Sequence, residues 1–410
     1  MVKAAAAAGL PLTVIGGQSG TVGGAVPSDG GIALSLERMS RILEVDRLSM
    51  TMTVEAGCIL QAAQETAEAQ KTLLPIDFGA RGTAMIGGVI GSNAGGNRVL
   101  RWGMMRDMVL GLEVVLADGT ILSSMTKMLK DNAGYAWKHL VIGSEGTLGV
   151  VTRAVLRLRP LPTSRQTAMI AVPSFGAAIT AMRQFEVTLS GRLSSFEIMW
   201  NDFYDRMSGG LVHRQPRPLP TGLGYYAVVE AMGGDEECDA AQFERVLGTL
   251  IENNTVTDAV IAQSEQQRQQ IWAVREDMNP GLADMRPLIA YDLAMAIVDM
   301  PVFVDRARAA MAAACPGATM LFYGHAGDGN LHVIVSRGEL SDETRLIFDT
   351  AIYEAVRTVG GSIAAEHGVG ISRRAFLGHT RSAGEVALMR ALKAAMDPAA
   401  TLNPGKIFAL

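Results

Sequence analysis

The chain has 410 residues, which corresponds to two or three domains and is long enough to bury a hydrophobic core. Charged residues make up 19% of it and apolar residues 49%, which excludes a disordered chain, and a net charge of −5 without a basic cluster argues against nucleic acid as a partner. Three widely spaced cysteines and the lack of an apolar stretch of ~20 residues argue against a disulfide framework and a transmembrane helix, so we expect a cytoplasmic protein.

Short strands separated by glycine turns are predicted for residues 1–160. The alanine-rich start resembles a signal peptide only weakly, because Gly9 and Pro11 interrupt it, and we favour a helix end that leads into a strand. An Ala-Asp-Gly-Thr turn at 117–120 predicts a hairpin. The expected elements are one helix at 59–71, the hairpin strands 113–116 and 121–123, and strands at 12–15, 32–36, 51–54, 110–116 and 148–158.

A second domain is predicted after the Pro-Leu-Pro-Thr-Ser segment at 160–164, which has the composition of a linker. Helical patterns alternate with β-rich runs beyond it, which predicts an α+β domain with an antiparallel sheet covered by helices. The expected helices lie near 175–190, 238–252, 264–284, 301–314, 341–359 and 383–396. The expected strands lie near 166–172, 224–232, 289–298, 319–324 and 331–335.

Glycine makes up about 11% of the chain against about 7% in average proteins, and it gathers in three loops at 16–24, 86–96 and 142–149. The first loop follows a predicted strand, where bare backbone amides could surround a pyrophosphate. No GxGxxG stretch is present, and the Gly405-Lys406 pair is not followed by Ser or Thr, which disfavours both a Rossmann domain and a P-loop. One such loop could be a structural turn. Three together favour a large, flat, phosphate-bearing ligand such as a flavin dinucleotide.

Two histidines flank an Asp-Gly pair at 328–329, a signal for a two-residue hairpin turn. With that turn His325 and His332 would be direct cross-strand partners, with Cβ atoms about 5 Å apart, and could bind a metal together. The Glu366-His367 pair adds a carboxylate and a third imidazole, and two histidines with one carboxylate are a common ligand set for a divalent cation. The alternative is that these histidines are ordinary core or surface residues.

These motifs in combination resemble the FAD-dependent oxidoreductases of the vanillyl-alcohol oxidase type, and specifically their D-2-hydroxy-acid dehydrogenase branch. Members such as D-lactate and D-2-hydroxyglutarate dehydrogenases carry glycine loops of this kind, an HxGDGNxHxN motif, an EHG motif and an NPGK tail, which starts here at Asn403. The resemblance implies an α+β fold with a PCMH-type FAD-binding domain of mixed sheets and flanking helices at 1–160, whose amino-terminal strand-helix unit is expected to be missing. It further implies a cap domain with the substrate and metal site at 161–400, and a tail at 401–410 that returns to the flavin.

The resemblance implies that FAD is bound noncovalently, because the first loop has neither the His nor the Cys that usually attaches a covalent flavin. The residues that it assigns to the cofactor are Gly16, Gly17, Gln18, Ser19, Gly20, Thr21, Gly23, Gly24, Pro75, Asp77, Thr83, Gly87, Gly88, Ser92, Asn93, Gly95, Gly96, Gly143, Glu145, Gly146, Val150, Glu366 and Asn403.

The resemblance also implies roles for the motifs of the second domain. His367 would be the general base, and Arg275 and Asn279 would bind the substrate, although Arg275 could instead be a structural arginine paired with a nearby glutamate. The expected ligands of a divalent metal, most simply zinc, are His325, His332 and Glu366.

The implied reaction is the oxidation of a D-2-hydroxy acid to the 2-oxo acid, with hydride transfer to flavin N5. Two positions depart from the family pattern: Ala290 replaces a lysine of several members, and Ile334 replaces the asparagine of the HxN motif. Both changes remove polar groups from the expected substrate site. They favour a smaller or more apolar acid over a dicarboxylate such as 2-hydroxyglutarate.

The electron acceptor is expected to lie outside the chain, because no cysteine cluster could hold an iron-sulfur relay. A soluble electron-transfer flavoprotein, a quinone or a cytochrome could serve, and the last two would bring the protein to the inner face of a membrane. We expect a homodimer. Two alternatives remain open at this point: a flavin-dependent alkyl transferase without net redox change, and an FAD subunit of a larger glycolate oxidase-like complex.

Overall fold

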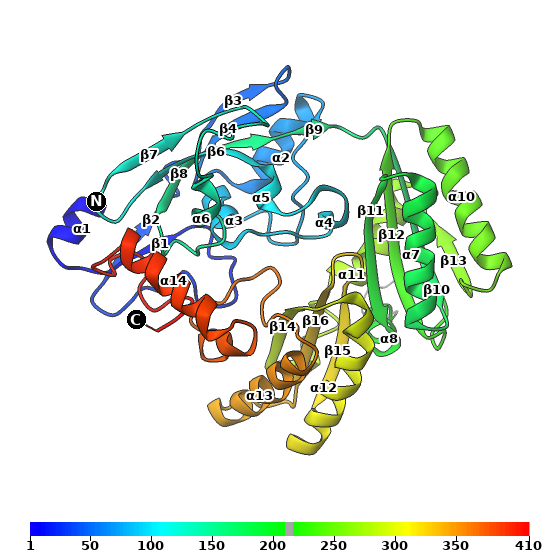
Figure 1. Cartoon of the computed structure of the whole chain (residues 1–410). Helices are drawn as coiled ribbons and strands as arrows, with labels where there is room; N and C mark the ends of the chain where they lie inside the picture. Colours follow the sequence, from blue (N-terminus) through cyan, green and yellow to red (C-terminus); the bar gives the residue numbers. More distant parts are fainter. Residues whose placement is uncertain (210–215, 410) are drawn as a thin grey trace. The chain divides into compact units, whose positions relative to one another are not determined.

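The computed structural model describes residues 1–209 and 216–409, so Leu410, the last residue of the expected tail, lies outside the described residues. The chain forms two compact units (Figure 1). Unit 1 contains Met1–Arg98, Trp102–Leu161 and Glu366–Leu410, and unit 2 contains Val99–Arg101 and Pro162–Ala365. Residues 366–400, which the sequence assigned to the second domain, therefore belong to unit 1. Within the described residues no helix is long and apolar enough to cross a membrane.

Unit 1 combines a five-stranded antiparallel sheet of order β3-β4-β8-β6-β7 with a parallel pair β1-β2 and a short pair β5-β9. Its strands are β1 (Leu12–Ile15), β2 (Ile32–Ser35), β3 (Ile42–Asp46), β4 (Thr51–Glu55), β5 (Thr72–Leu73), β6 (Val109–Val115), β7 (Ile121–Ser124), β8 (Val150–Arg157) and β9 (Arg159–Pro160). Its helices are α1 (Val2–Ala7), α2 (Leu60–Ala69), α3 (Ile86–Ser92), α5 (Met105–Met108), α6 (Lys138–Val141) and α14 (Ala383–Met396), with a 3-10 turn at Arg374–His379; α4 (Val99–Trp102) spans both units.

The core of unit 1 lies between its large sheet and the helices α2 and α3. Leu60 and Ala63 of α2 and Ile90 of α3 are fully buried with Met52 of β4 and Leu112 of β6. This packing fixes α3, and with it the second glycine loop, against the sheet. The sequence did not predict α3, because its glycines obscure the helical pattern of Ile86, Val89 and Ile90.

Unit 2 is built on a seven-stranded antiparallel sheet of order β13-β10-β12-β11-β15-β16-β14. Its strands are β10 (Ser164–Val172), β11 (Leu193–Trp200), β12 (Tyr225–Gly233), β13 (Asp258–Ile261), β14 (Leu288–Ala294), β15 (Thr319–His325) and β16 (Asn330–Ser336). Its helices are α7 (Phe175–Leu189), α8 (Asn201–Met207), α10 (Glu236–Glu252), α11 (Glu265–Glu276), α12 (Met300–Ala314) and α13 (Asp342–Thr358), with 3-10 turns at Ala283–Met285 and Ile297–Asp299.

One face of this sheet packs against α8 and α11, where Phe203 of α8 stacks on Tyr323 of β15 with ring centroids 4.4 Å apart. Side chains alternate along a strand, so Met169 belongs to this face and Ala168 to the other, which α7 and α10 cover. Every residue of β11 is buried, on both faces of the sheet, so its sequence does not alternate between apolar and polar residues, and this hid β11 from the sequence pattern.

Two predicted elements are shorter in the structure than the sequence suggested. The helix expected at 264–284 starts after the cap Ser264, whose side chain accepts from Gln267 N, but ends at Glu276, shortly before Pro280. The strand expected at 289–298 ends at Ala294, because Met295 N turns to donate to Gly329 O at 2.9 Å and a 3-10 turn follows.

Candidate active site

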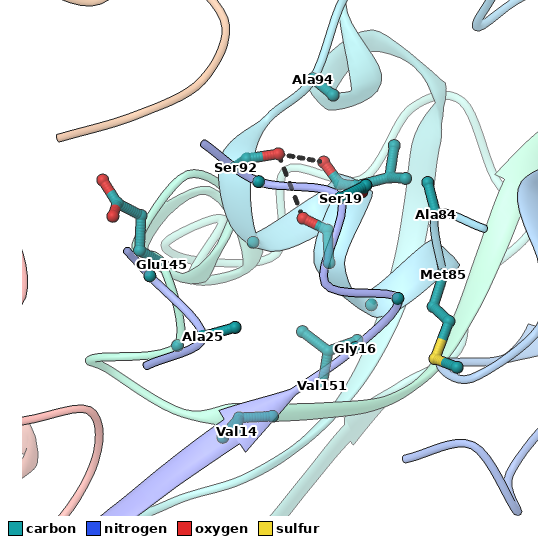
Figure 2. A pocket seen from close by; sticks show the side chains of 18 of the residues that line it. Val14, Gly16, Ser19, Ala25, Ala84, Met85, Ser92, Ala94, Glu145 and Val151 are labelled. Atoms are coloured by element: carbon teal, nitrogen blue, oxygen red, sulfur yellow. Dashed lines mark hydrogen bonds between the residues drawn. The ribbon is translucent and has the colours of Figure 1, made fainter. Parts of the chain in front are cut away.

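A pocket in unit 1 brings together segments that are far apart in the sequence: the three glycine loops, the Glu366–His367 motif and Asn403 of the tail. Figure 2 shows it from close by, with Gly16 and Ser19 of the first loop, Ser92 of α3 and Glu145 of the third loop around it. The predicted residues that line it are Gly16, Gly17, Gln18, Ser19, Gly20, Gly24, Gly87, Gly88, Ser92, Gly95, Glu145, Gly146, Val150, Glu366, His367 and Asn403.

The glycines of this pocket serve two different purposes. A Cβ on Gly17 would lie 1.8 Å from Thr83 O, so this glycine allows the first loop to pack against the neighbouring backbone. A Cβ on Gly20 or Gly88 would have no protein atom within 4 Å, although both residues line the pocket. The protein leaves space for a side chain at both positions, yet both are glycine. This fits a site where a ligand approaches the backbone. The residues present therefore fit a dinucleotide cofactor.

Asn403 joins the tail to β1, just before the first loop, and to the third loop. Its Oδ1 accepts from Val14 N at 2.8 Å, and its Nδ2 donates to Glu145 O at 2.6 Å. Behind it the buried Lys393 donates to Thr147 O and Leu402 O, both at 2.8 Å, and pairs with Asp397. Burial lowers the pKa of Lys393 and the Asp397 carboxylate opposes that shift. These bonds explain why residues after 366 belong to unit 1.

Several predicted cofactor residues hold the loops together without lining the pocket. Asp77 forms ion pairs with Arg81 at 2.6 Å and Arg98 at 3.0 Å, and its strand-like backbone pairs with Gly96. Asn93 ends α3 in the left-handed region, and its Oδ1 accepts from Arg106 N at 2.8 Å. The other predicted residues outside the lining are Thr21, Gly23, Pro75, Thr83 and Gly143.

The predicted base His367 lies at the pocket with an exposed side chain. Its Nδ1 is 3.1 Å from Thr21 Oγ1, so Nε2 is the nitrogen that can exchange a proton with a substrate. The preceding Glu366 accepts from Gly96 N at 2.5 Å through Oε1. The first and second glycine loops thus hold the two residues of this motif.

The two histidines of the hairpin lie on the same face of the unit 2 sheet, but the predicted register is wrong. His325 pairs with Asn330 and His332 pairs with Tyr323, so the loop is the four-residue stretch 326–329 instead of a two-residue turn. The histidines are diagonal neighbours, with ring centroids 5.2 Å apart. The two residues of slip keep both side chains on one face, because strand side chains alternate with a period of two. The third predicted ligand, Glu366, belongs to unit 1, so the metal site stays a prediction.

Each histidine has a buried carboxylate on the neighbouring strand. Glu197 of β11 is opposite His325, and its Oε1 lies 2.7 Å from His325 Nδ1. Asp292 of β14 is opposite His332, with 3.9 Å between Oδ1 and Nδ1. A carboxylate on Nδ1 fixes the ring and makes Nε2 of His325 the atom that can bind a cation, which is an arrangement common behind metal-binding histidines.

The predicted substrate residue Arg275 is 5% exposed, and its Nη2 lies 2.8 Å from the other Glu197 oxygen. Its guanidinium also lies 4.5 Å from the centre of the Tyr323 ring. Burial pushes the pKa of Glu197 upward, but the charges of His325 and Arg275 outweigh it and the net shift is downward. Asn279, the other predicted substrate residue, is exposed, and its Oδ1 accepts from Arg286 Nη2 at 2.8 Å.

Sequence reasoning missed Glu197 and the apolar lining of the pocket. Glu197 is 128 residues from His325, on a strand that was not predicted, so no local signal marks it. The apolar lining includes Val89 of α3, a helix whose glycines obscured its spacing in the sequence. Other lining residues outside the prediction include Val14, Val22, Ala56, Phe78, Met85 and Val151.

Comparison with known proteins gives consistent results along the chain. Residues 1–124 match the family described as "FAD binding domain", and residues 161–407 match "FAD linked oxidases, C-terminal domain". The D-2-hydroxyglutarate dehydrogenase of Xanthomonas citri pv. viticola is 38% identical over 100% of this chain and 86% of its own length. The D-2-hydroxyglutarate dehydrogenase of Stutzerimonas stutzeri is 33% identical over 100% of this chain and 88% of its own length. The mitochondrial D-2-hydroxyglutarate dehydrogenase of Bos taurus is 36% identical over 96% of this chain and 71% of its own length.

Solved structures support the fold. An alkyldihydroxyacetonephosphate synthase superposes with a TM-score of 0.73 at 19% identity, covering 98% of this chain and 73% of its own. The 4-ethylphenol oxidase from Gulosibacter chungangensis has a TM-score of 0.72 at 18% identity, covering 100% and 87%. At such identities the likeness concerns the fold, and it confirms the predicted α+β architecture with a PCMH-type FAD-binding domain. With these matches the resemblance inferred from the motifs is confirmed: the chain belongs to the FAD-linked oxidases, in the family of the D-2-hydroxyglutarate dehydrogenases.

Proposed function

We propose that the protein is a dehydrogenase that oxidises a D-2-hydroxy acid to the 2-oxo acid with noncovalent FAD. The observation that carries this proposal is the pocket of unit 1, in which open glycines and His367 line the same cavity. Bound FAD would supply a two-electron acceptor for the hydride that leaves the substrate Cα. The relatives named as D-2-hydroxyglutarate dehydrogenases support the same reaction class.

His367 is proposed as the general base. The hydroxyl proton of the substrate would pass to Nε2, because Thr21 engages Nδ1. The hydrogen bond that Gly96 N donates to the Glu366 carboxylate limits the freedom of the segment that carries the imidazole. One proton and one hydride leave the substrate together, which balances the conversion of the alcohol to a carbonyl.

The test compares His367→Ala with the wild type by anaerobic rapid mixing with a D-2-hydroxy acid. We expect both proteins to show a bound-flavin spectrum, and the flavin to be bleached at least about 100-fold more slowly in the variant. Bleaching of the variant at the wild-type rate would overturn the base assignment. Bound FAD that no hydroxy acid bleaches in the wild type would favour the non-redox alkyl transferase alternative instead.

We further propose a divalent metal, most simply zinc, held by His325, His332 and Glu366. Two imidazoles on one sheet face, one of them hydrogen-bonded to Glu197, are donors that zinc prefers, and a carboxylate such as that of Glu366 would complete a common ligand set. Such a cation would bind the substrate carboxylate and hydroxyl and favour the alkoxide. Chelation should lower turnover by roughly 100-fold while the flavin stays bound, and zinc should restore it. Turnover that resists prolonged chelation, in protein shown to be metal-free, would exclude the metal.

The substrate is proposed to have a small or apolar side chain. Ala290 and Ile334 are direct cross-strand partners on β14 and β16, on the face that carries His332, which lies two residues before Ile334 on β16. Ile334 is 2% exposed and packs in the apolar core with Leu321 and Tyr323. Arg275 is already paired with Glu197, so its charge is less available to a second carboxylate of the substrate.

This preference is tested by comparing kcat/KM for D-lactate and D-2-hydroxyglutarate. We expect the smaller acid to be favoured, and the double variant Ala290→Lys with Ile334→Asn to shift the ratio toward the dicarboxylate by about tenfold. A wild-type preference for D-2-hydroxyglutarate would refute the proposal and would agree with the names of the relatives.

The electron acceptor is proposed to be a soluble electron-transfer flavoprotein, a quinone or a cytochrome, and the protein to be a cytoplasmic homodimer. Turnover with an artificial dye but not with oxygen is expected. Inactivity of the isolated chain with any dye would instead indicate the FAD subunit of a larger complex, and the mass of the purified protein in solution tests the dimer.

A further inference from the structure

Glu145 connects more segments of the unit 1 pocket than its predicted role as a cofactor residue requires. Its backbone N donates to Gly91 O at 2.8 Å, in the second glycine loop. Its backbone O accepts from Asn403 Nδ2 at 2.6 Å, in the tail. Its own backbone is left-handed, with φ of 53°. The chain thus holds this residue in a strained conformation between two other segments of the pocket.

The carboxylate of Glu145 binds the backbone that follows His367. One oxygen accepts from Val369 N and the other from Gly370 N, both at 2.8 Å. Two adjacent amides that point at one carboxylate form a small anion-binding site made by the backbone. Both oxygens of the side chain therefore bind the protein backbone.

Two glycines near this contact show how closely the backbone after His367 packs against its neighbours. A Cβ on Gly368 would lie 2.6 Å from Glu145 Oε1, and Gly368 has a φ of 79°. Gly370 has a φ of 53°, and a Cβ there would lie 2.2 Å from Val22 O of the first loop. Ile371 N also donates to Val22 O, at 2.9 Å. The backbone after His367 therefore lies between the Glu145 carboxylate and the first loop.

We propose that Glu145 is a positioning residue for His367: its carboxylate fixes the backbone from Gly368 to Gly370 and thereby holds the imidazole at the pocket, where Thr21 engages Nδ1. The inference rests on the proposed role of His367 as the base. Removing the carboxylate lets the segment move, and a base displaced by about 1 Å can lose on the order of 100-fold in rate. Substrate affinity should change little, because Glu145 touches no residue proposed to bind the substrate.

The first experiment compares Glu145→Gln with the wild type at saturating FAD. A carboxamide keeps the size of the side chain but can accept from only one of the two amides, because its nitrogen is itself a donor. We expect the limiting rate of flavin reduction to fall about 10- to 100-fold. The apparent dissociation constant of the hydroxy acid should stay within about threefold of the wild type. Unchanged reduction in Glu145→Gln would overturn the proposal.

The matched control is Glu385→Gln in the same unit. The Glu385 carboxylate also accepts a backbone N–H, from Ser382 at 2.8 Å, but in the capping box that starts α14. This change should lower the unfolding midpoint slightly and leave flavin reduction unchanged. The comparison therefore distinguishes the effect of losing any carboxylate–amide hydrogen bond from the effect of losing the one that Glu145 makes at the pocket.

A double-variant cycle distinguishes this inference from the proposed function. If Glu145 acts through His367, adding Glu145→Gln to His367→Ala should slow flavin reduction no further. Additive effects would refute the positioning role. A wild-type rate for His367→Ala would instead overturn the proposed role of His367 as the base, whatever Glu145→Gln does.

Gly368→Ala tests the same contact from the other side and covers the case in which Glu145→Gln loses its flavin. The added Cβ meets the Glu145 carboxylate, so we expect slower reduction with FAD still bound. Normal reduction in Gly368→Ala, combined with loss of FAD in Glu145→Gln, would show that Glu145 serves the cofactor and not the base.

Discussion

The two units of the chain build their sites from different groups. The pocket of unit 1 is lined by backbone and small residues, such as Gly20 and Gly88, and its polar side chains mostly bind neighbouring backbone. The sheet face of unit 2 presents large ionisable and aromatic side chains, with Glu197 bound to both His325 and Arg275. Backbone approach suits a large cofactor that needs many weak contacts, whereas charged side chains suit a small substrate and a cation.

This difference predicts that substitutions in the two units separate flavin binding from chemistry. A change in unit 1 should alter FAD content first, because the cavity is shaped by the absence of side chains. A change in unit 2 should alter the stability of that unit and the reaction, with the flavin still bound.

Glu197→Ala should give the largest effect. It leaves the buried Arg275 without its partner and removes the hydrogen-bond acceptor of His325. Breaking a buried ion pair by removing one partner costs about 3–5 kcal/mol, so the free energy of unfolding of unit 2 should fall by that amount in urea. FAD affinity of the folded protein should be unchanged, since no residue of the pocket is touched. A large loss of FAD affinity would contradict the separation of the two sites.

The double variant Glu197→Leu with Arg275→Met gives the control for that prediction. Replacing both charged partners with apolar groups of similar size leaves no buried charge behind, so much of the lost stability should return. Turnover should stay low, because His325 loses the carboxylate that orients its ring. Equal stability of the single and double variants would show that the ion pair is not what holds this face together.

The hairpin of the two histidines shows what the sequence can and cannot predict. The Asp328-Gly329 pair correctly indicates a reversal of the chain, and the spacing of His325 and His332 correctly places them on one face. Turn length is decided by neighbouring strands as well: His325 also pairs with Glu197 of β11, and Gly329 O accepts from Met295 N beyond β14. Those contacts join residues that are far apart in the sequence, so no local sequence pattern predicts them.

The same limit applies to the pocket. The three glycine loops predict a ligand-binding pocket from the sequence, because glycine is the residue that lets backbone approach a ligand. The link from Glu145 to Val369 and Gly370 spans 224 and 225 residues, and nothing in either segment predicts it. Regular helices such as α14, expected at 383–396 and found at Ala383–Met396, were predictable because apolar spacing and a Ser-x-x-Glu capping box act locally.

Gly17→Ala and Gly20→Ala should behave differently although both glycines line one pocket. The Gly17 Cβ would overlap Thr83 O, so this variant should lose about 3 kcal/mol of stability even without FAD. The Gly20 Cβ meets no protein atom, so its apoprotein should unfold normally while FAD affinity falls about tenfold, or about 1.4 kcal/mol. Urea unfolding of the apoproteins and FAD titration measure the two effects. Normal FAD affinity in Gly20→Ala would remove the case for cofactor contact at that loop.

The rates at which the buried cysteines are labelled compare the two units directly, and the expected effect is the smallest of those predicted. Cys58 is buried in unit 1 and Cys315 is buried in unit 2, whereas Cys238 is exposed. Burial raises the pKa of Cys58 to about 11, and the Glu55 charge adds to the shift. Only about a thousandth of that thiol is then ionised at pH 8, so a thiol reagent should reach Cys58 through local or global opening alone.

FAD should protect the two buried cysteines unequally. In a Cys238→Ser background, FAD at about ten times its dissociation constant should slow Cys58 labelling about tenfold, because FAD stabilises the closed form of the unit that binds it by about 1.4 kcal/mol. Cys315 should keep its rate if unit 2 opens independently. Labelling in low urea, followed by mass spectrometry of the two peptides, measures both rates in one sample. Equal protection of both cysteines would show that the two units open together. The difference between the backbone-lined site of unit 1 and the side-chain-lined site of unit 2 would then not extend to their unfolding.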